Sequence, residues 1–270
     1  MLRVQYLNRR GHRIAYALRG APEAPPLLMI RGLARTSRHW GAVLGELEQS
    51  FRLVLIDNRG IGKSGVPLLP FSTRDMADDA AALLDWLDID AASVLGVSLG
   101  GMIAQELALR HGDRVAKLVL GCTRAGGGTG VPLDWRTALR LVAPMRLPAE
   151  QAIRKTAALI LSPDFQRESP HVVDEWVQIA RELPPSRRGV IYQLFAAARH
   201  DASTRLGQLR MPTLVVTGDA DVLIHADNSA HLARAIPGAR LATLPGAGHD
   251  FPTERPRDTA RLVREFCLEE

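Results

Sequence analysis

The sequence predicts an α/β fold with a mostly parallel sheet that helices cover on both faces, and three observations lead to this prediction. Short apolar runs, such as residues 27–30 and 93–97, are typical of strands that are buried on both faces. These runs alternate with segments such as 73–87, in which apolar residues recur three or four positions apart. The chain has 270 residues, of which 46% are hydrophobic and 23% charged, so it is long enough to bury a sizeable core.

The first part of the chain predicts a hairpin followed by alternating strands and helices. Residues 4–7 and 13–18 flank a short turn that contains Gly11, which predicts an antiparallel pair at one edge of the sheet. The pattern then predicts strands at 27–30, 51–56, 93–97 and 115–120, and helices at 40–47, 73–87 and from 99 onwards.

A change of pattern after Gly121 indicates an insertion. Residues 133–206 look helical, contain several proline breaks and carry no strand signal. Alternation returns with predicted strands at 213–217 and 240–244 and predicted helices at 229–235 and 257–267. We therefore expect residues 1–122 and 210–270 to form one core and residues 123–209 to form a helical cap. Such a cap would lie over the carboxyl ends of the strands, where open α/β sheets bind ligands.

The segment Gly96-Val97-Ser98-Leu99-Gly100 joins a predicted strand to a predicted helix. A Gly-x-Ser-x-Gly sequence in this context is typical of a nucleophile elbow, in which a sharp turn presents the serine hydroxyl. The two glycines remove Cβ atoms that would collide with neighbouring backbone. Ser98 is therefore the candidate nucleophile.

Asp221 and His249 each follow a later predicted strand, at the same sheet edge as Ser98. Serine is a poor nucleophile until an imidazole takes its proton, and a carboxylate must orient that imidazole and stabilise its charged form. The order Ser98, Asp221, His249 is the one expected on this topology. We prefer Asp221 to Asp219, which lies nearer the strand and suits a turn. The other histidines are expected to be structural.

Acyl transfer by a serine also needs hydrogen-bond donors for the oxyanion, and backbone N–H groups supply them rigidly. The N–H of Leu99 follows from the elbow. We expect the second donor to be the N–H of Leu33, because Gly32 allows the backbone of that loop to approach closely. This second assignment depends on topology.

The charge pattern argues against a nucleic-acid partner. The formal net charge is +5, but the basic residues are scattered and nearly all arginine, with lysine only at Lys63, Lys117 and Lys155. The first residues carry charge where a signal peptide is apolar, and no apolar run approaches the ~18 residues of a membrane span. We therefore expect a cytoplasmic protein without a membrane partner. The sequence leaves the oligomeric state open, a homo-oligomer included.

Two further motifs are assigned structural roles. The end of Gly60-Ile61-Gly62-Lys63-Ser64 looks like a phosphate-binding loop, but Asp57 stands where that motif needs glycine. Asp57 and Arg59 are expected to form an ion pair instead. Cys122 and Cys267 are too few for a zinc site or a disulfide framework, and no cluster has metal-ligand spacing. We expect no metal and no cofactor.

These residues together resemble the α/β-hydrolase fold family across nearly the whole chain. The resemblance rests on four motifs, Gly96-Val97-Ser98-Leu99-Gly100-Gly101, Asp57-x-Arg59-Gly60-x-Gly62-x-Ser64, Pro212-Thr213-Leu214-Val215-Val216-x-Gly218-x-x-Asp221 and Gly246-x-Gly248-His249. The sequence is similar to small bacterial carboxylesterases and lactonases with a helical cap, such as 3-oxoadipate enol-lactonase and aclacinomycin methylesterase.

The resemblance implies a cofactor-free hydrolase with nucleophile Ser98, base His249, acid Asp221 and oxyanion donors at Leu33 and Leu99. The family usually has His-Gly in the first oxyanion loop, and this chain has Arg31-Gly32. Arg31 either pins that loop through a carboxylate or lends positive charge to the site. The second role would suit an anionic substrate.

The predicted function is a serine hydrolase that cleaves a small-molecule ester or lactone through an acyl-enzyme. Two alternatives stay open. The same triad serves C–C bond hydrolysis or perhydrolysis in relatives of this fold, and a receptor of this fold would bind a ligand with little turnover. The predicted pocket includes Arg31, Trp135, Met145 and Trp176, although apolar cap residues at helical spacing are also typical of a cap core.

Overall fold

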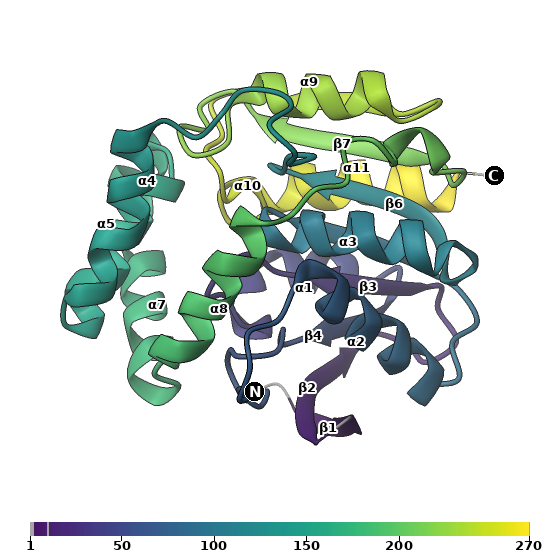
Figure 1. The fold of residues 1–270 in the computed structure, drawn as a ribbon, viewed down its shortest axis with the longest axis horizontal. Coiled ribbons are helices and arrows are strands. Elements are labelled where there is room, and N and C mark those ends of the chain that lie inside the picture. The colour runs from purple at the N-terminus through teal and green to yellow at the C-terminus, as the bar shows by residue number, and fades with distance from the viewer. Residues whose placement is uncertain (1–2, 10, 270) are drawn as a thin grey trace.

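The structure is a computed structural model that describes residues 3–9 and 11–269. Within these residues the strands form one eight-stranded sheet (Figure 1). The strands are β1 (Val4–Arg9), β2 (His12–Arg19), β3 (Pro26–Ile30), β4 (Arg52–Ile56), β5 (Ala92–Val97), β6 (Val115–Gly121), β7 (Thr213–Gly218) and β8 (Arg240–Leu244). Every predicted strand is present, with bounds that differ by at most two residues.

The strand order is β1-β2-β4-β3-β5-β6-β7-β8. β1 pairs with β2 and β2 with β4 in antiparallel fashion, and the other neighbours are parallel. The mostly parallel sheet with an antiparallel pair at one edge is therefore confirmed. β3 and β5 lie side by side at its centre, so the loops that follow both strands open at the same edge.

Alternating side chains of the central strands enter two separate cores. Leu28 and Ile30 of β3 pack with α2 (Thr73–Trp86), α3 (Leu99–Arg110) and α9 (Ala226–Ala235) on one face. Leu27 and Met29 pack on the other face, against α1 (Val43–Leu47) and α11 (Pro256–Leu268). Both faces of β3 are thus covered, which explains its unbroken apolar sequence.

Five α-helices lie between β6 and β7 in the chain and gather beyond one end of the sheet, at the left of Figure 1. We call residues 123–209 the cap segment. Its helices contribute Leu159 and Trp176 to a third, smaller core, which Leu223 and Ile224 after β7 also join. The cap helices are α4 (Trp135–Val142), α5 (Ala149–Ile160), α6 (Pro163–Glu168), α7 (Pro170–Glu182) and α8 (Arg187–Ala198).

Two prolines of this segment mark the starts of α-helices. Pro163 and Pro170 stand at the first positions of α6 and α7, where the missing N–H costs no intrahelical bond. The oxygen of the Ser162 side chain accepts from the Phe165 N–H and caps α6.

Two local features differ from the sequence prediction. The helix expected at 40–47 is divided into a 3₁₀ turn at Ser37–Trp40 and the short α1, because Gly41 between them has φ of +55°. The short helix α10 (Phe251–Glu254) was not predicted, since four residues are too few for a periodic pattern. Further 3₁₀ turns are at Gly112–Arg114, Ala143–Arg146 and Leu206–Gln208.

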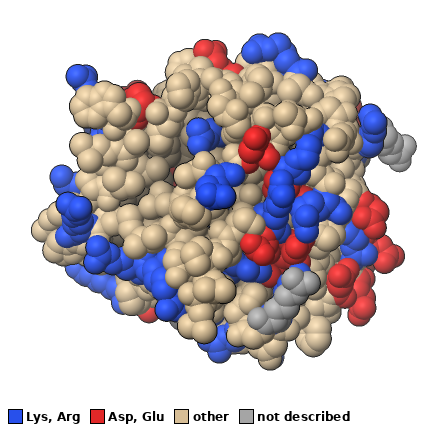
Figure 2. All heavy atoms as spheres, viewed as in Figure 1, with Lys and Arg blue, Asp and Glu red and all other residues tan. Residues whose placement is uncertain are grey.

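On the face shown in Figure 2, Lys and Arg are spread from side to side, while Asp and Glu lie mostly at the centre and right of the view. Ion pairs at the protein surface include those of Arg154 with Glu150 and Asp174. None of the helices in the described part of the chain has the length and apolar character needed to cross a bilayer.

Candidate active site

Ser98 occupies the turn between β5 and α3 in a strained conformation, with φ of 60° and ψ of −121°. The turn is held by the Ser98 N–H, which donates to the Gly121 carbonyl at 2.8 Å. A Cβ atom on Gly96 would lie 2.3 Å from the Gly100 oxygen, and one on Gly100 would lie 2.0 Å from the Ile30 oxygen. Both positions therefore require glycine, as the elbow interpretation predicts.

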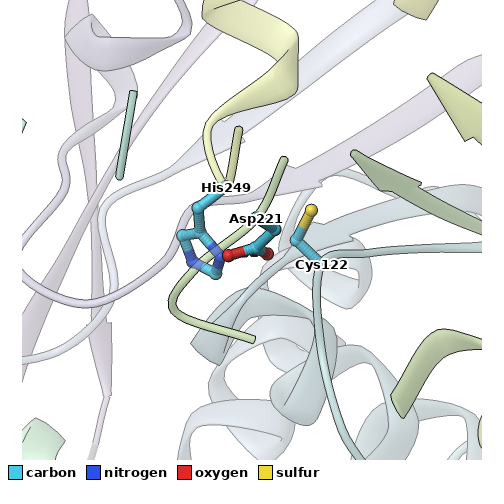
Figure 3. Close-up of side chains that lie close together, drawn as sticks. All are labelled: Cys122, Asp221 and His249. Carbon is cyan, nitrogen blue, oxygen red and sulfur yellow. Dashed lines mark hydrogen bonds and ion pairs between the residues drawn. The ribbon is translucent and has the colours of Figure 1, made fainter. Parts of the chain in front are cut away.

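His249 and Asp221 form a buried pair, in which His249 Nδ1 lies 2.8 Å from Asp221 Oδ2 (Figure 3). The other carboxylate oxygen, Oδ1, accepts from the N–H groups of Leu223 and Ile224 at 2.8 and 2.9 Å. The Asp221 carboxylate is thus fixed with one oxygen facing the imidazole. Asp219 instead accepts from the Gly246 N–H in the neighbouring turn, so the structure pairs His249 with Asp221.

Cys122 joins this pair in Figure 3, which the sequence spacing did not reveal. Cys122, Asp221 and His249 each have one atom that could bind a metal, and these three atoms lie within 4.8 Å of one another, which is close enough to suggest a metal site. Burial, followed by the neighbouring Asp221 charge, raises the pKa of the Cys122 thiol well above its ordinary value. Asp221 Oδ2 is already engaged by His249 Nδ1, and Oδ1 by two backbone N–H groups, so the carboxylate and the imidazole are paired with each other and the set does not fit a metal. The neutral thiol is suited to donate a hydrogen bond to Asp221.

The loop after β3 lies directly against Ser98. A Cβ atom on Gly32 would be 3.0 Å from Ser98 Cβ and 3.4 Å from its Oγ, so glycine permits this approach. The Arg35 N–H donates to the Gly32 carbonyl and the Ala34 N–H donates to Gln193 Oε1. Within the described residues the Leu33 N–H has no acceptor.

Leu99 is the first residue of α3. The N–H groups of a first helical turn lack intrahelical partners and carry the positive end of the helix dipole. The Leu99 and Leu33 N–H groups are therefore both free to face an anion that forms beside Ser98.

Arg31 forms a buried bidentate pair with Asp250, with nitrogen–oxygen distances of 2.9 and 2.7 Å. Burial alone would raise the pKa of Asp250, but Arg31 and then Arg35 hold the pKa of that carboxyl below its ordinary value. The sequence left two roles open for Arg31, which were to pin its loop through a carboxylate or to lend positive charge to the site. The structure shows the pinning role, because the pair ties the loop after β3 to Asp250, the residue that follows His249.

The predicted ion pair between Asp57 and Arg59 is wrong. The Arg59 guanidinium binds Asp79 of α2 with two contacts of 2.6 Å. Asp57 accepts from the N–H groups of Ser37 and Lys63 instead, and burial raises the pKa of its carboxyl. A contact to a residue about 20 positions away cannot be read from local spacing.

A cavity of about 300 Å³ opens beside Ser98 and His249. Of the four residues that the sequence suggested for the pocket, Arg31 and Met145 line this cavity, and Leu33, Arg35 and Asp250 line it as well. Trp135 and Trp176 do not: Trp135 is 71% exposed on the outer side of α4, and Trp176 is buried in the cap core. The cap segment and the following residues add a mostly apolar wall, formed by Leu141, Pro144, Leu147, Ala149, Ala152, Ile153, Thr156, Ile160, Pro184, Pro185, Arg187, Val190, Leu194 and Leu223.

Comparison with known proteins identifies the family of this chain. The model of the "Alpha/beta hydrolase family" matches residues 27–262, which is most of the chain. The chain belongs to the alpha/beta hydrolase family. The eight-stranded sheet, the elbow between β5 and α3 and the loops at the carboxyl edge are thus those of an alpha/beta hydrolase.

Relatives in this family match over most of their length. A poly(3-hydroxyalkanoate) depolymerase from Ectopseudomonas oleovorans is 30% identical, with 93% of this chain and 87% of the relative covered. 3-Oxoadipate enol-lactonase 2 of Acinetobacter baylyi is 27% identical, with 90% and 88% covered. The crystal structure of a hydrolase from Pseudomonas aeruginosa superposes with a TM-score of 0.87 at 30% identity and covers 99% of this chain and 98% of its own.

Proposed function

We propose that this alpha/beta hydrolase cleaves a carboxylic ester or a lactone, with Ser98 as nucleophile, His249 as general base and Asp221 as the residue that orients His249. The observation that carries the proposal is that Ser98 and His249 line one cavity while Asp221 holds His249 Nδ1 at 2.8 Å. A carboxylate on Nδ1 keeps the proton there, which leaves Nε2 as the atom able to accept the serine proton.

The reaction proceeds in two halves. Ser98 Oγ attacks the carbonyl carbon while its proton passes to His249 Nε2, and the carbonyl oxygen becomes an oxyanion. When the bond to the leaving oxygen breaks, His249 returns the proton to that oxygen and an acyl-enzyme remains. Water then attacks the acyl carbon, His249 takes one of its protons, and collapse of the second oxyanion returns that proton to Ser98 Oγ and releases the acid.

The N–H groups of Leu33 and Leu99 would receive the oxyanion. Both belong to rigid backbone, so they need no reorientation as charge develops. Gly32 supports this role, since its lack of a side chain allows the loop to lie against Ser98. A donor of this type is worth about 10² to 10³ in rate.

The names of the relatives support the bond type. One is a depolymerase of poly(3-hydroxyalkanoate) and another is an enol-lactonase. Polyhydroxyalkanoates and lactones both contain an ester carbonyl. We propose that this protein cleaves the same type of bond in a small-molecule substrate, without a cofactor. We further propose that the protein is cytoplasmic, and that residues 1–122 and 210–270 form its core and residues 123–209 its cap.

The test uses a panel of p-nitrophenyl esters and lactones together with a fluorophosphonate probe. The wild-type protein should turn over members of the panel and be labelled by the probe. Ser98→Ala should lose labelling and at least about 10⁴-fold in kcat, since the nucleophile itself is removed. Ser203→Ala, a change at a half-buried serine that does not line the cavity, is the matched control and should keep both signals.

Labelling of Ser98→Ala at the wild-type level would contradict the assignment of the nucleophile. Mass spectrometry of the products then identifies the bond that breaks. An acid and an alcohol, or a hydroxy acid from a lactone, are expected.

A further inference from the structure

Arg35 is a buried arginine in the wall of the cavity, and the carboxylate whose charge acts on it, Asp250, is already bound by Arg31. It follows the turn that presents the Leu33 N–H, lines the cavity and is 7% exposed. Neither of its two Nη atoms has a hydrogen-bond acceptor within the described residues. The Trp176 ring covers one face, with the guanidinium carbon 3.8 Å from the ring centroid. A buried guanidinium without acceptors is costly, so its presence calls for an explanation.

The surrounding charges do not balance Arg35. Asp250 is the one carboxylate among the described residues that line the cavity, and Arg31 occupies both of its oxygens. His39 on the next turn supplies no negative charge, because a histidine is neutral or cationic. Its Nδ1 accepts from the Thr36 N–H. Arg31 and Asp250 cancel each other. Arg35 and Arg187 therefore leave two positive charges in the cavity wall, and of these two Arg35 is buried while Arg187 is exposed.

The remainder of the cavity wall is mostly apolar, so the buried charge of Arg35 is poorly screened there. The Nε atom of Arg31 is also buried without an acceptor. An anion in this part of the cavity would find two arginines with unused donors and little competing water. The Nη atoms of Arg35 are buried in the structure, so contact with a ligand requires the Arg35 side chain to rotate toward the cavity.

We propose that Arg35 recognises a free carboxylate carried by the substrate, so that the cavity takes an ester or lactone with an apolar body and one anionic group. This inference rests on the proposed function for the identity of the scissile bond. It differs from a role for Arg31, whose charge Asp250 already neutralises. An arginine can hold a carboxylate through two parallel hydrogen bonds, which suits selection of one substrate end.

Two amides test the binding step apart from catalysis. Hexanamide and adipamate have chains of six carbons and the same amide, and only adipamate has a terminal carboxylate. By calorimetry the wild-type protein should bind adipamate at least about 10-fold more tightly than hexanamide, as expected for a hydrogen bond to a charged group. Arg35→Leu should abolish this preference, and Arg35→Lys should retain part of it because the charge is kept without the planar donor pair.

Arg38→Leu is the matched control. It removes the same charge three residues further on, where Arg38 is paired with Glu182 outside the cavity, and it should keep the preference for adipamate. Circular dichroism verifies that each variant is folded. Equal binding of the two amides by the wild-type protein, or an undiminished preference in both Arg35 variants, would overturn the inference.

Turnover of p-nitrophenyl hexanoate and of the mono-p-nitrophenyl ester of adipate separates the two proposals. Hydrolysis of both esters without a preference for adipamate would overturn the carboxylate site and leave the proposed function intact. A preference for adipamate that depends on Arg35, in a protein that hydrolyses neither ester, would support the site and contradict the proposed function.

Discussion

Gly32 shows how one missing side chain sets the geometry of the site. A Cβ atom added at Gly32 would lie only 3.0 Å from Ser98 Cβ, so a side chain there would require the loop to move. The sequence predicted this close approach from the position of the glycine after a buried strand. It did not predict Arg35, because a guanidinium without acceptors can be recognised only when the surrounding side chains are known.

Gly32→Ala should lower esterase activity while the protein remains folded. The added methyl group pushes the loop away from Ser98 and displaces the Leu33 N–H, and loss of one such donor costs about 10²-fold to 10³-fold in kcat. Gly45→Ala is the control, because a Cβ atom there meets nothing within 4 Å. Steady-state kinetics on a p-nitrophenyl ester measures both variants. Wild-type kcat in Gly32→Ala would argue against Leu33 as an oxyanion donor.

At the scale of elements, the strands were predictable because burial on both faces leaves a continuous apolar run, as in β3 and β5. The motifs at their carboxyl ends then predicted which side chains meet. The wall that the cap helices supply was less predictable. Trp135 and Leu141 share α4, yet Leu141 lines the cavity and Trp135 faces solvent. Helical periodicity gives two faces without saying which one meets the core.

His200, just beyond α8, ties the end of the cap segment to the start of α2, since its Nδ1 lies 3.1 Å from Thr73 Oγ1. Burial, the largest influence, lowers the pKa of His200 to about 4. As the pH falls below about 6.5, the His200 imidazole becomes protonated in the unfolded chain, whereas in the folded protein it stays neutral down to about pH 4. The contribution of neutral His200 to the free energy of unfolding is therefore fully present above about pH 6.5 and is lost as the pH falls from 6.5 toward 4.

The wild-type protein should lose free energy of unfolding between pH 7.5 and pH 5.0, and His200→Gln should reduce this loss by about 2 kcal/mol. The figure corresponds to the interval from about pH 6.5 to pH 5.0, over which the unfolded chain is protonated at His200 and the folded protein is not. Urea unfolding of the wild type and the variant at the two pH values measures the difference. His171→Gln, at an exposed histidine in α7, should leave the pH dependence close to that of the wild type. An unaltered pH dependence in His200→Gln would show that His200 takes up its proton in the folded protein.

At the scale of the whole molecule, the pair of Arg31 and Asp250 joins two residues that are 219 positions apart in the sequence. The pair thereby connects the loop after β3 to the start of α10. Arg31 also stacks on Trp40, with its guanidinium carbon 4.7 Å from the ring centroid. A long-range buried pair of this kind holds the candidate oxyanion loop and His249 in one relative position. The sequence raised the role of Arg31 as a question, and only the folded chain identifies Asp250 as its partner.

A double-mutant cycle tests whether this pair acts as a unit. Arg31→Met and Asp250→Asn should each destabilise the protein by roughly 3–5 kcal/mol, because each leaves the other charge buried without its partner. The double variant should be more stable than the sum of the single changes predicts, by about 1–3 kcal/mol, since no uncompensated charge of the pair is left. Urea unfolding measures all four proteins. Additive effects would mean that Arg31 and Asp250 stabilise the fold independently, and the loop after β3 would then need another anchor to stay beside Ser98.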